Sequence, residues 1–201
     1  MPYIETSQSM LLLVAVLSYL LGSVPFGMVV TRMMNLGNLR DIGSGNIGTT
    51  NVLRTGNKKA AALTLIFDAG KGALAVLIAR ALFAEDAAQL AGLSAFLGHL
   101  FPIWLKLHGG KGVATFLGLM LALNFWIGLL CCATWLVVAA ILRISSMAAL
   151  VSVATSPIWM IMLQDGGMLI LSLILTILIY AKHWPNVRRL RAGTEPKIGA
   201  K

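Results

Sequence analysis

Residues 113–142 read VATFLGLMLALNFWIGLLCCATWLVVAAIL, and no side chain in this stretch carries a charge. A helix crosses the hydrocarbon core of a bilayer with about 20 mainly apolar residues, so the stretch indicates a membrane protein. Lys111 and Arg143 flank it. Because cytoplasmic loops are rich in Lys and Arg, both residues are expected on one side of the membrane, with an even number of crossings between them. We therefore predict two short, steep helices at residues 113–125 and 127–142; a re-entrant pair is the alternative.

The rest of the chain has the same apolar character. Of its 201 residues, 58% are hydrophobic and 11% are charged, whereas about a quarter of the residues of a soluble domain are charged. We predict an all-α integral membrane protein that forms a single polytopic domain over residues 1–201, with several short or tilted spans. The seven predicted transmembrane helices are residues 10–30, 60–84, 87–105, 113–125, 127–142, 147–163 and 168–181.

Charged residues alternate between the loops that join these spans. Basic residues lie in the loops after the first, third, fifth and seventh spans, whereas Glu85, Asp86 and Asp165 lie in the intervening turns. This bias predicts an N-terminus outside the cell and a C-terminus in the cytoplasm, and it also accounts for the net charge of +9. No stretch interleaves aromatic and basic residues in the manner of a surface that stacks nucleic-acid bases, so no nucleic-acid partner is expected.

Three clusters of glycine, polar and basic residues interrupt the apolar sequence, and the predicted orientation places all of them at the cytoplasmic face. The first reads RDIGSGNIGTTN at residues 40–51. Gly43 and Gly45 allow tight turns that bring backbone N–H groups to an anion, and Arg40 and Arg54 can hold phosphate through their planar guanidinium groups. The alternative is a flexible polar loop with helix caps; the many short polar side chains favour ligand binding.

The second cluster reads KLHGGKG at residues 106–112 and immediately precedes a predicted span. The N-terminus of that helix presents free N–H groups and a partial positive charge toward the cytoplasm, and Lys111 adds a full charge beside Gly109 and Gly110. The residue after Lys111 is Gly112, so the cluster is not a Walker A loop and does not indicate nucleotide binding. An ordinary basic loop is the alternative.

The third cluster reads HWPNVRR at residues 183–189. His183, Asn186 and Arg189 are spaced three apart and share a helical face if the last span continues, whereas Pro185 indicates a helix start or a kink. Taken alone, this cluster resembles a basic tail that follows a membrane span.

Several polar residues lie within or beside the predicted spans. Asp68 and Lys71 are one helical turn apart, and the cost of charge in a membrane favours a structural ion pair inside the bundle. His99 is either a buried, hydrogen-bonded side chain or a substrate contact. Ser23 and Pro25 lie in the first predicted span, where a hydroxyl and a broken helix could line a cavity. Ser145 and Ser146 lie close to Arg143 at the inner mouth of a span.

The clusters resemble those of the bacterial membrane acyl-phosphate:glycerol-3-phosphate acyltransferases. The resemblance covers essentially the whole chain and rests on three ordered motifs: GSGNIGTTN at 43–51, GHLFP at 98–102 with GGKGVAT at 109–115, and His183-x-x-Asn186-x-x-Arg189 followed by Glu195. Family members often have Ala at position 49 and Phe-Lys at 107–108, where this chain has Thr49 and Leu107-His108.

The resemblance implies an enzyme of the bacterial inner membrane with its active groove at the cytoplasmic face. It implies transfer of a fatty acyl group from acyl phosphate to the 1-hydroxyl of glycerol 3-phosphate, giving lysophosphatidic acid and phosphate. The expected partners are these two substrates and membrane lipid, and the expected state is a monomer. No cofactor and no metal are expected, and the adjacent Cys131 and Cys132 do not have metal-ligand spacing.

Two anionic reactants must be held close together, which requires cations and N–H donors. We predict phosphate binding by Arg40, Lys111 and Arg189, and placement of glycerol 3-phosphate by His183 and Asn186. The predicted catalytic residues are Ser44, Lys111, His183 and Asn186. The predicted binding residues are Arg40, Gly43, Gly45, Asn46, Thr49, Thr50, Asn51, Arg54, His99, Gly109, Gly110, Ser145, Arg189 and Glu195. The proton acceptor stays open between the donor phosphate and His183.

Three other classes of protein compete with this interpretation. A transporter for a phosphorylated metabolite would explain the basic groove, but it should also carry polar residues through the outer halves of its spans, which are apolar here. A purely structural subunit leaves the first cluster unexplained. An acyltransferase that uses acyl-CoA is disfavoured because no Asp lies five residues after any histidine; those positions hold Trp104, Val113 and Arg188.

Overall fold

The computed structural model describes residues 2–199, and this part of the chain contains helices and no strands. Met1, Ala200 and Lys201, the ends of the predicted 1–201 domain, lie outside the described residues. The α-helices are α1 (Gln8–Gly22), α2 (Phe26–Met33), α3 (Thr49–Leu53), α4 (Lys58–Leu82), α5 (Glu85–Leu100), α6 (Val113–Leu123), α7 (Phe125–Leu142), α8 (Ser145–Met162), α9 (Leu169–Lys182) and α10 (Trp184–Arg191). Short 3₁₀ helices are η1 (Leu39–Asp41), η2 (Ile103–Leu105) and η3 (Gly166–Met168).

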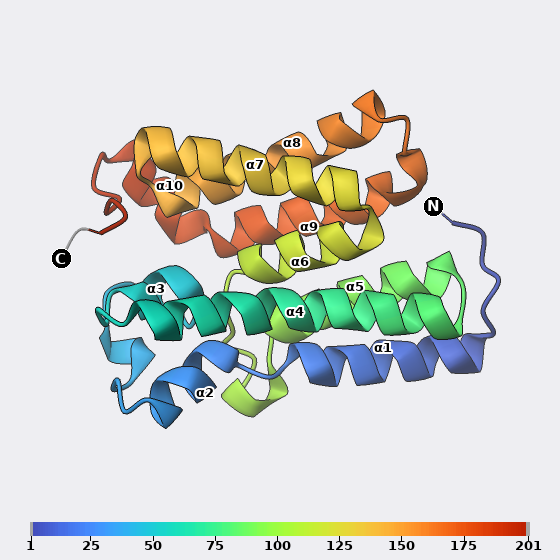
Figure 1. Cartoon of the computed structure of the whole chain (residues 1–201), viewed down its shortest axis with the longest axis horizontal. Coiled ribbons are helices and arrows are strands. Elements are labelled where there is room, and N and C mark those ends of the chain that lie inside the picture. Colours follow the sequence, from blue (N-terminus) through green and yellow to red (C-terminus); the bar gives the residue numbers. More distant parts are fainter. Residues whose placement is uncertain (1, 200–201) are drawn as a thin grey trace.

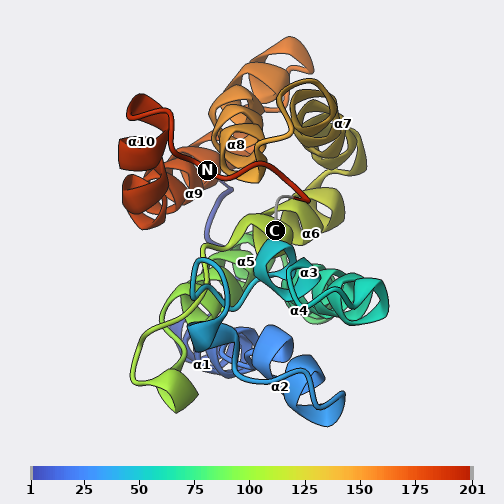
Figure 2. The ribbon, with the colours of Figure 1, turned by 90° about the vertical axis from the view of Figure 1, so that its left-hand side faces the viewer.

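The longer helices run side by side along the long axis of the molecule (Figure 1). Seen along that axis, α1, α4 and α5 form one group and α7, α8 and α9 form another, with α6 between the two (Figure 2). Helix α6 packs on both α4 and α7. The main core lies where α5, α6, α7 and α9 meet, and its fully buried members include Phe96, Phe116, Met120, Ile127 and Leu175.

Each of the predicted spans is helical over most of its length. The first is broken at residues 23–25 into α1 and α2, as Pro25 indicated, because proline has no N–H group to donate within a helix. The third ends as α5 at Leu100 and continues only as the 3₁₀ turn η2, and α6 ends at Leu123. Helix α7 starts at Phe125, two residues earlier than predicted. There the Asn124 side chain accepts hydrogen bonds from the N–H groups of Trp126 (3.0 Å) and Ile127 (3.1 Å) and so caps the helix.

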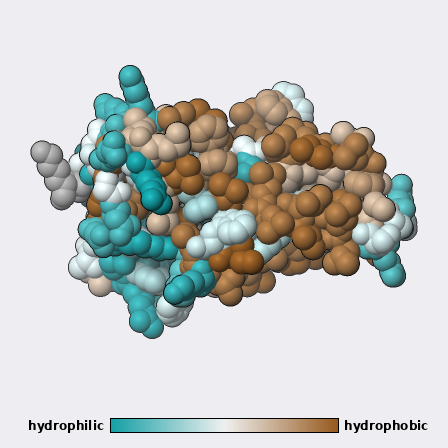
Figure 3. Space-filling model, turned by 90° about the horizontal axis from the view of Figure 1, so that it is seen from below, coloured by the Kyte–Doolittle hydropathy of each residue, from teal (hydrophilic) through white to brown (hydrophobic). Residues whose placement is uncertain are grey.

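On the face shown in Figure 3, hydrophobic residues cover most of the surface between two hydrophilic ends. By length and composition, the segments able to cross a membrane in the described residues are Gln8–Met33, Lys58–Leu82, Glu85–Leu105, Phe125–Leu142 and Ser145–Met162. The pair Gly166–Lys182 and Trp184–Arg191, bent by 63°, gives a sixth, and Val113–Leu123 is apolar but shorter.

The two ends of the bundle differ in charge. Helices α3 and α10 lie at one end (Figure 1), which we call the basic end and define by Arg40, Arg54, Lys111 and Arg189. The turns that hold Glu85, Asp86 and Asp165 lie at the opposite end. All three clusters therefore lie at the same end of the bundle.

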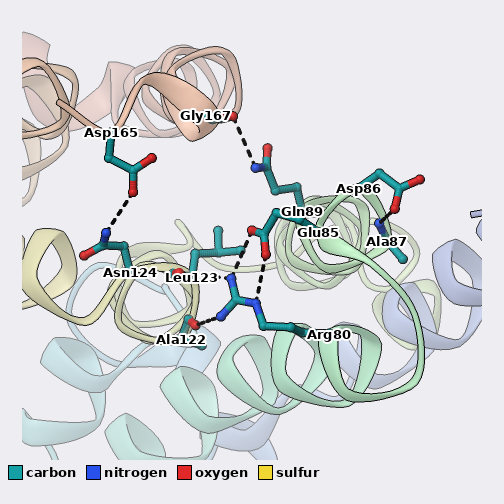
Figure 4. Close-up of polar contacts among 10 residues, drawn as sticks. All are labelled: Arg80, Glu85, Asp86, Ala87, Gln89, Ala122, Leu123, Asn124, Asp165 and Gly167. Atoms are coloured by element: carbon teal, nitrogen blue, oxygen red, sulfur yellow. Dashed lines mark hydrogen bonds and ion pairs between the residues drawn. The ribbon is translucent and has the colours of Figure 1, made fainter. Parts of the chain in front are cut away.

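At the opposite end, Arg80 stabilises the end of the short helix α6 (Figure 4). Its guanidinium donates to the carbonyl oxygens of Ala122 (2.5 Å) and Leu123 (3.0 Å) and also pairs with both carboxylate oxygens of Glu85, at 2.9 and 3.0 Å. The last carbonyl groups of a helix have no partner within it, and a cation there also matches the helix dipole. Arg80 thus allows α6 to end inside the bundle.

Replacing Arg80 with Ala should therefore destabilise the fold without altering the chemistry at the basic end. Loss of the two carbonyl contacts should cost about 1–3 kcal/mol, or roughly 3–10 °C in Tm for a chain of this size. Thermal unfolding of the purified protein measures this shift. Glu85→Ala is the matched control: it removes the ion pair but keeps the carbonyl contacts, so its shift should be less than half as large. Equal shifts would contradict the capping role.

Candidate active site

The three clusters contact one another through α8 and α10 at the basic end. Thr50 Oγ1 of the first cluster lies 3.0 Å from Ser145 Oγ at the start of α8. Lys111 Nζ of the second cluster donates to Asn186 Oδ1 of the third at 2.5 Å. Ser146 Oγ donates to Glu195 Oε1 at 2.7 Å, which joins α8 to the segment after α10. Residues far apart in the sequence thus surround one site.

The first cluster is an ordered loop organised by Asn51, which is only 2% exposed. Asn51 Nδ2 donates to the carbonyl oxygens of Leu39 (3.0 Å) and Asn46 (2.8 Å). Its Oδ1 accepts from the backbone N–H of Ser44 (3.1 Å) and from Arg54 (3.3 Å). The Asn51 side chain therefore connects several parts of the loop, and the Ser44 N–H group is used inside it.

Gly43 shows why this loop needs glycine. Its φ of +53° lies in the left-handed region, and a Cβ there would meet Arg54 and Asn51 Oδ1 at 2.6–2.7 Å. Gly45 (φ +66°) adopts the same kind of conformation. The hydroxyl oxygen of Thr49, the first residue of α3, is buried with no hydrogen-bond partner among the described residues.

Arg40 joins the first cluster to the second. Its guanidinium donates to the carbonyl oxygens of Gly45 (3.2 Å) and His108. The side chain is exposed and lines an open hollow of about 500 Å³ together with residues 104–106 and His108. Its predicted partner, a phosphate, would lie in that hollow, apart from Lys111.

The second cluster folds back on the end of α5. The N–H groups of Gly109 and Gly110 donate to the carbonyl oxygens of Leu100 (3.2 Å) and His99 (3.1 Å). Lys111 then points to the third cluster. Burial lowers the pKa of Lys111 to about 8; Glu195 acts to raise it, and the charges of Arg189 and Arg54 lower it further.

The third cluster contains a bend rather than a continuous helix. Helix α9 ends at Lys182 and α10 begins at Trp184 with Pro185 in its first turn, at an angle of 63°. The kink that Pro185 indicated is therefore present. Asn186 Nδ2 donates to Glu195 Oε1 at 2.6 Å, and Arg189 Nε donates to Glu195 Oε2 at 2.7 Å.

Glu195 is ionised, although its side chain is only 6% exposed. Burial acts to raise the pKa of this carboxyl group, but hydrogen bonds from Asn186, Ser146 and Arg189 outweigh burial and hold the pKa below its usual value. Glu195 therefore holds Asn186 and Arg189 of the third cluster in place, and its negative charge partly neutralises Arg189.

His183 is buried at the bend between α9 and α10, 3% exposed. Its Nδ1 lies 2.9 Å from the carbonyl oxygen of Ile179. Because a carbonyl oxygen only accepts, Nδ1 carries the hydrogen and Nε2 keeps its lone pair. Burial, with the charge of Lys111, lowers the pKa of His183 to about 4, against the opposing effects of the Ile179 contact and Glu195. The ring is neutral at pH 7.

Not every predicted residue faces this site. His99 is 4% exposed and lies behind Gly110, and Asn51 holds the loop from within. Ser146, absent from the predicted site, binds Glu195. The pair Ser145-Ser146 after Arg143 was the only sequence signal for it, and the first turn of α8 decides which hydroxyl faces which cluster.

The assembled groups suit one kind of ligand. Lys111 lies within electrostatic reach of Arg54 and Arg189, and its own charge acts on the neutral imidazole of His183, which keeps a free lone pair. Such a site can hold a phosphate and accept a hydrogen bond from a hydroxyl. Over residues 2–199, no group of three or more His, Cys, Asp or Glu residues could hold a metal ion.

Comparison with known proteins gives consistent matches along the chain. A family model described as glycerol-3-phosphate acyltransferase matches residues 12–193. The glycerol-3-phosphate acyltransferases of Cereibacter sphaeroides and Ruegeria pomeroyi are each 59% identical over all of this chain, covering 96% and 99% of their own lengths. The crystal structure of PlsY, an integral membrane glycerol 3-phosphate acyltransferase, in its glycerol 3-phosphate form has a TM-score of 0.89 at 33% identity. The structural match covers 94% of this chain and 96% of the PlsY chain.

Proposed function

The chain belongs to the glycerol-3-phosphate acyltransferase family, which confirms the resemblance of its motifs, and we propose that its acyl donor is an acyl phosphate. The acceptor is the 1-hydroxyl of glycerol 3-phosphate, and the products are lysophosphatidic acid and phosphate. The observation that carries the proposal is the position of Lys111, which lies within electrostatic reach of Arg54 and Arg189 and also of the neutral ring of His183.

Cations are needed because both reactants are phosphates that repel each other at the distance required for reaction. Lys111 supplies an ammonium group between the first and third clusters, Arg54 and Arg189 flank it, and Asn186 fixes its position. Binding both anions in this arrangement places the two reactants next to each other, which increases the rate by several orders of magnitude over a bimolecular encounter in solution.

Acyl transfer then needs little help from a protein base, because phosphate is a good leaving group. The 1-hydroxyl oxygen forms a bond to the carbonyl carbon of the donor, and the resulting oxyanion collapses as the bond from that carbon to the phosphate oxygen breaks. The hydroxyl proton passes to the departing phosphate. His183 Nε2 accepts the hydrogen bond of the attacking hydroxyl and so orients it, while Lys111 stabilises the developing negative charge.

The membrane arrangement completes the proposal. The chain is a multi-pass membrane protein, as its likeness to an integral membrane structure and its apolar helices indicate. We propose seven crossings with α6 as a short one, an N-terminus outside, and the basic end in the cytoplasm of a bacterial inner membrane. In this arrangement a single monomeric domain draws its acyl donor from the lipid and glycerol 3-phosphate from the cytoplasm.

A comparison of donors tests the function. Purified protein in lipid is given labelled glycerol 3-phosphate with either palmitoyl phosphate or palmitoyl-CoA. We expect labelled lysophosphatidic acid from palmitoyl phosphate alone. Transfer from the thioester, or from neither donor, would contradict the proposal. Sealed vesicles without donor serve as the control for a transporter, and they should not accumulate labelled glycerol 3-phosphate.

A further inference from the structure

Three ionisable side chains meet inside the bundle behind the second cluster. Asp68 and Lys71 of α4 and His99 of α5 are 2%, 3% and 4% exposed. Lys71 Nζ lies 3.0 Å from Asp68 Oδ1, and His99 Nδ1 lies 3.6 Å from the same oxygen. Charged groups at this depth are costly and persist where they serve a purpose, and the acyl transfer described above uses none of them.

Lys71 ties this group to the broken first span. Its Nζ donates to the carbonyl oxygen of Val24 at 2.8 Å, in the segment between α1 and α2 where Pro25 interrupts the helix. The ammonium group also lies 5.7 Å from the centre of the Phe26 ring. Lys71 thereby links Asp68 to the break between α1 and α2, and the His99 ring packs beside Asp68 at a separation longer than a hydrogen bond.

The other edge of the His99 ring supports the second cluster. A Cβ atom at Gly110 would collide with His99 Nε2, so the ring lies directly against the glycine backbone. The Gly110 N–H group donates to the His99 carbonyl oxygen at 3.1 Å. Lys111 is the next residue, and its ammonium group is the one bound to Asn186.

We propose that His99 is a positioning residue whose ring, packed between Asp68 and Gly110, sets the backbone of Gly110 and thereby places the ammonium group of Lys111 in the site. The Nε2 edge of the ring faces the Gly110 backbone. The inference rests on the proposed function only for what Lys111 does once it is in place.

A double-mutant cycle between the ring and the glycine tests this role. Gly110→Ala should lower kcat/KM about 100-fold, because a displacement near 1 Å at a catalytic group costs about that much. His99→Ala should cost about tenfold, mostly in kcat, by loosening the loop. In the double variant the new methyl group occupies space left by the ring, so about tenfold of the Gly110→Ala loss should be regained. Independent sites would instead give additive losses, about 1000-fold together, and that result would overturn the proposal.

Gly109 provides the matched control. A Cβ there would collide with the His99 carbonyl oxygen and with Pro102 Cδ, neither of which His99→Ala removes. The loss caused by Gly109→Ala should therefore not be regained in combination with His99→Ala. Equal recovery at both glycines would show general loosening and would also overturn the role of the ring.

A second measurement does not depend on turnover. Acetylation of Lys111, followed by mass spectrometry across a pH series, should have a midpoint near its pKa of about 8. In His99→Ala the midpoint should move up toward the ordinary lysine value, because the displaced ammonium group is better solvated. An unmoved midpoint would contradict the proposal. If His99→Ala does not fold, as gel filtration would show, His99→Ser replaces it in every arm, because its small side chain also leaves the space of the ring empty.

The two proposals fail in different ways. Normal activity of Lys111→Ala would remove Lys111 from the proposed chemistry while a shifted acetylation midpoint still supported His99. An inactive Lys111→Ala together with an unmoved midpoint would keep the proposed function and exclude the positioning role.

Discussion

Lys111→Ala is expected to lower kcat by about 10²–10³-fold, the usual cost of removing one group that stabilises charge developing in a transition state. Lys111 is half-buried, bonded to Asn186 at 2.5 Å, and lies within reach of Glu195, Arg189 and Arg54. Without the Lys111 ammonium group, Arg54 and Arg189 remain, but the site lacks the cation that lies between the first and third clusters. Initial rates with palmitoyl phosphate and labelled glycerol 3-phosphate measure the loss.

Lys59→Ala is the control for loss of positive charge alone. Lys59 is exposed in the first turn of α4 and also lies at the basic end. Its removal should leave the rate within about twofold, because an exposed charge is screened by solvent and salt. Near-normal turnover in Lys111→Ala, or a loss no larger than that of Lys59→Ala, would show that Lys111 does not act in the reaction.

The same residue predicts a pH dependence. The ammonium form of Lys111 is the useful one, and with a pKa of about 8 it is fully present at pH 6–7 and lost as the pH rises through 8. The kcat/KM for glycerol 3-phosphate should therefore fall on the alkaline side with a midpoint near 8. In Lys111→Arg the charge persists at all these pH values, so the alkaline fall should move above pH 9 in whatever activity remains.

The helices were predictable because a segment that crosses a membrane needs about 20 mainly apolar residues, and such stretches are easily recognised in a sequence. Apolar stretches bounded by charged residues, such as the one between Lys111 and Arg143, are expected to be helical in a membrane, because the backbone polar groups must be satisfied within the segment. Pro25 also indicated the break in the first span. What the sequence leaves open is which distant residue supports the end of a helix: Arg80 satisfies the last carbonyl groups of the short helix α6.

The site was predictable as a set of cations and less so as a set of contacts. Glycine, lysine and arginine in three clusters indicate anion binding wherever the clusters meet. The partner of each cation depends on the fold. Arg189 binds Glu195, whereas Arg40 binds the backbone carbonyl oxygens of Gly45 and His108. Sequence spacing does not report such contacts, because they join segments whose separation only the packed bundle determines.

His99 illustrates the same limit. Its two sequence interpretations were a buried, hydrogen-bonded side chain and a substrate contact. The structure buries the ring between Asp68 and the backbone of Gly110. Asp68 lies on α4 and Gly110 in the second cluster. The sequence spacing of Asp68, His99 and Gly110 does not indicate that the first and the last of them lie on opposite sides of the His99 ring.

Asn51→Ala is expected to disrupt the whole first cluster and to lower activity by about 100-fold through misplacement of Arg54 and Ser44. The amide joins four partners: the carbonyl groups of Leu39 and Asn46, the Ser44 N–H group and Arg54. Each buried group left without a partner costs about 1–3 kcal/mol, so stability should fall as well. Asn51→Asp should be similarly inactive, because a carboxylate cannot donate to either carbonyl oxygen.

Asn57→Ala separates lost stability from lost geometry. Asn57 caps α4 by accepting from the Ala60 N–H group at 3.0 Å, and its removal should cost about 1 kcal/mol while leaving the first cluster intact. At a temperature where both variants remain folded, Asn57→Ala should keep its turnover and Asn51→Ala should not. If activity in both followed the fraction of folded protein, Asn51 would merely stabilise the fold. Loss of turnover from fully folded Asn51→Ala would instead mean that the shape of the 43–54 loop is itself required for catalysis.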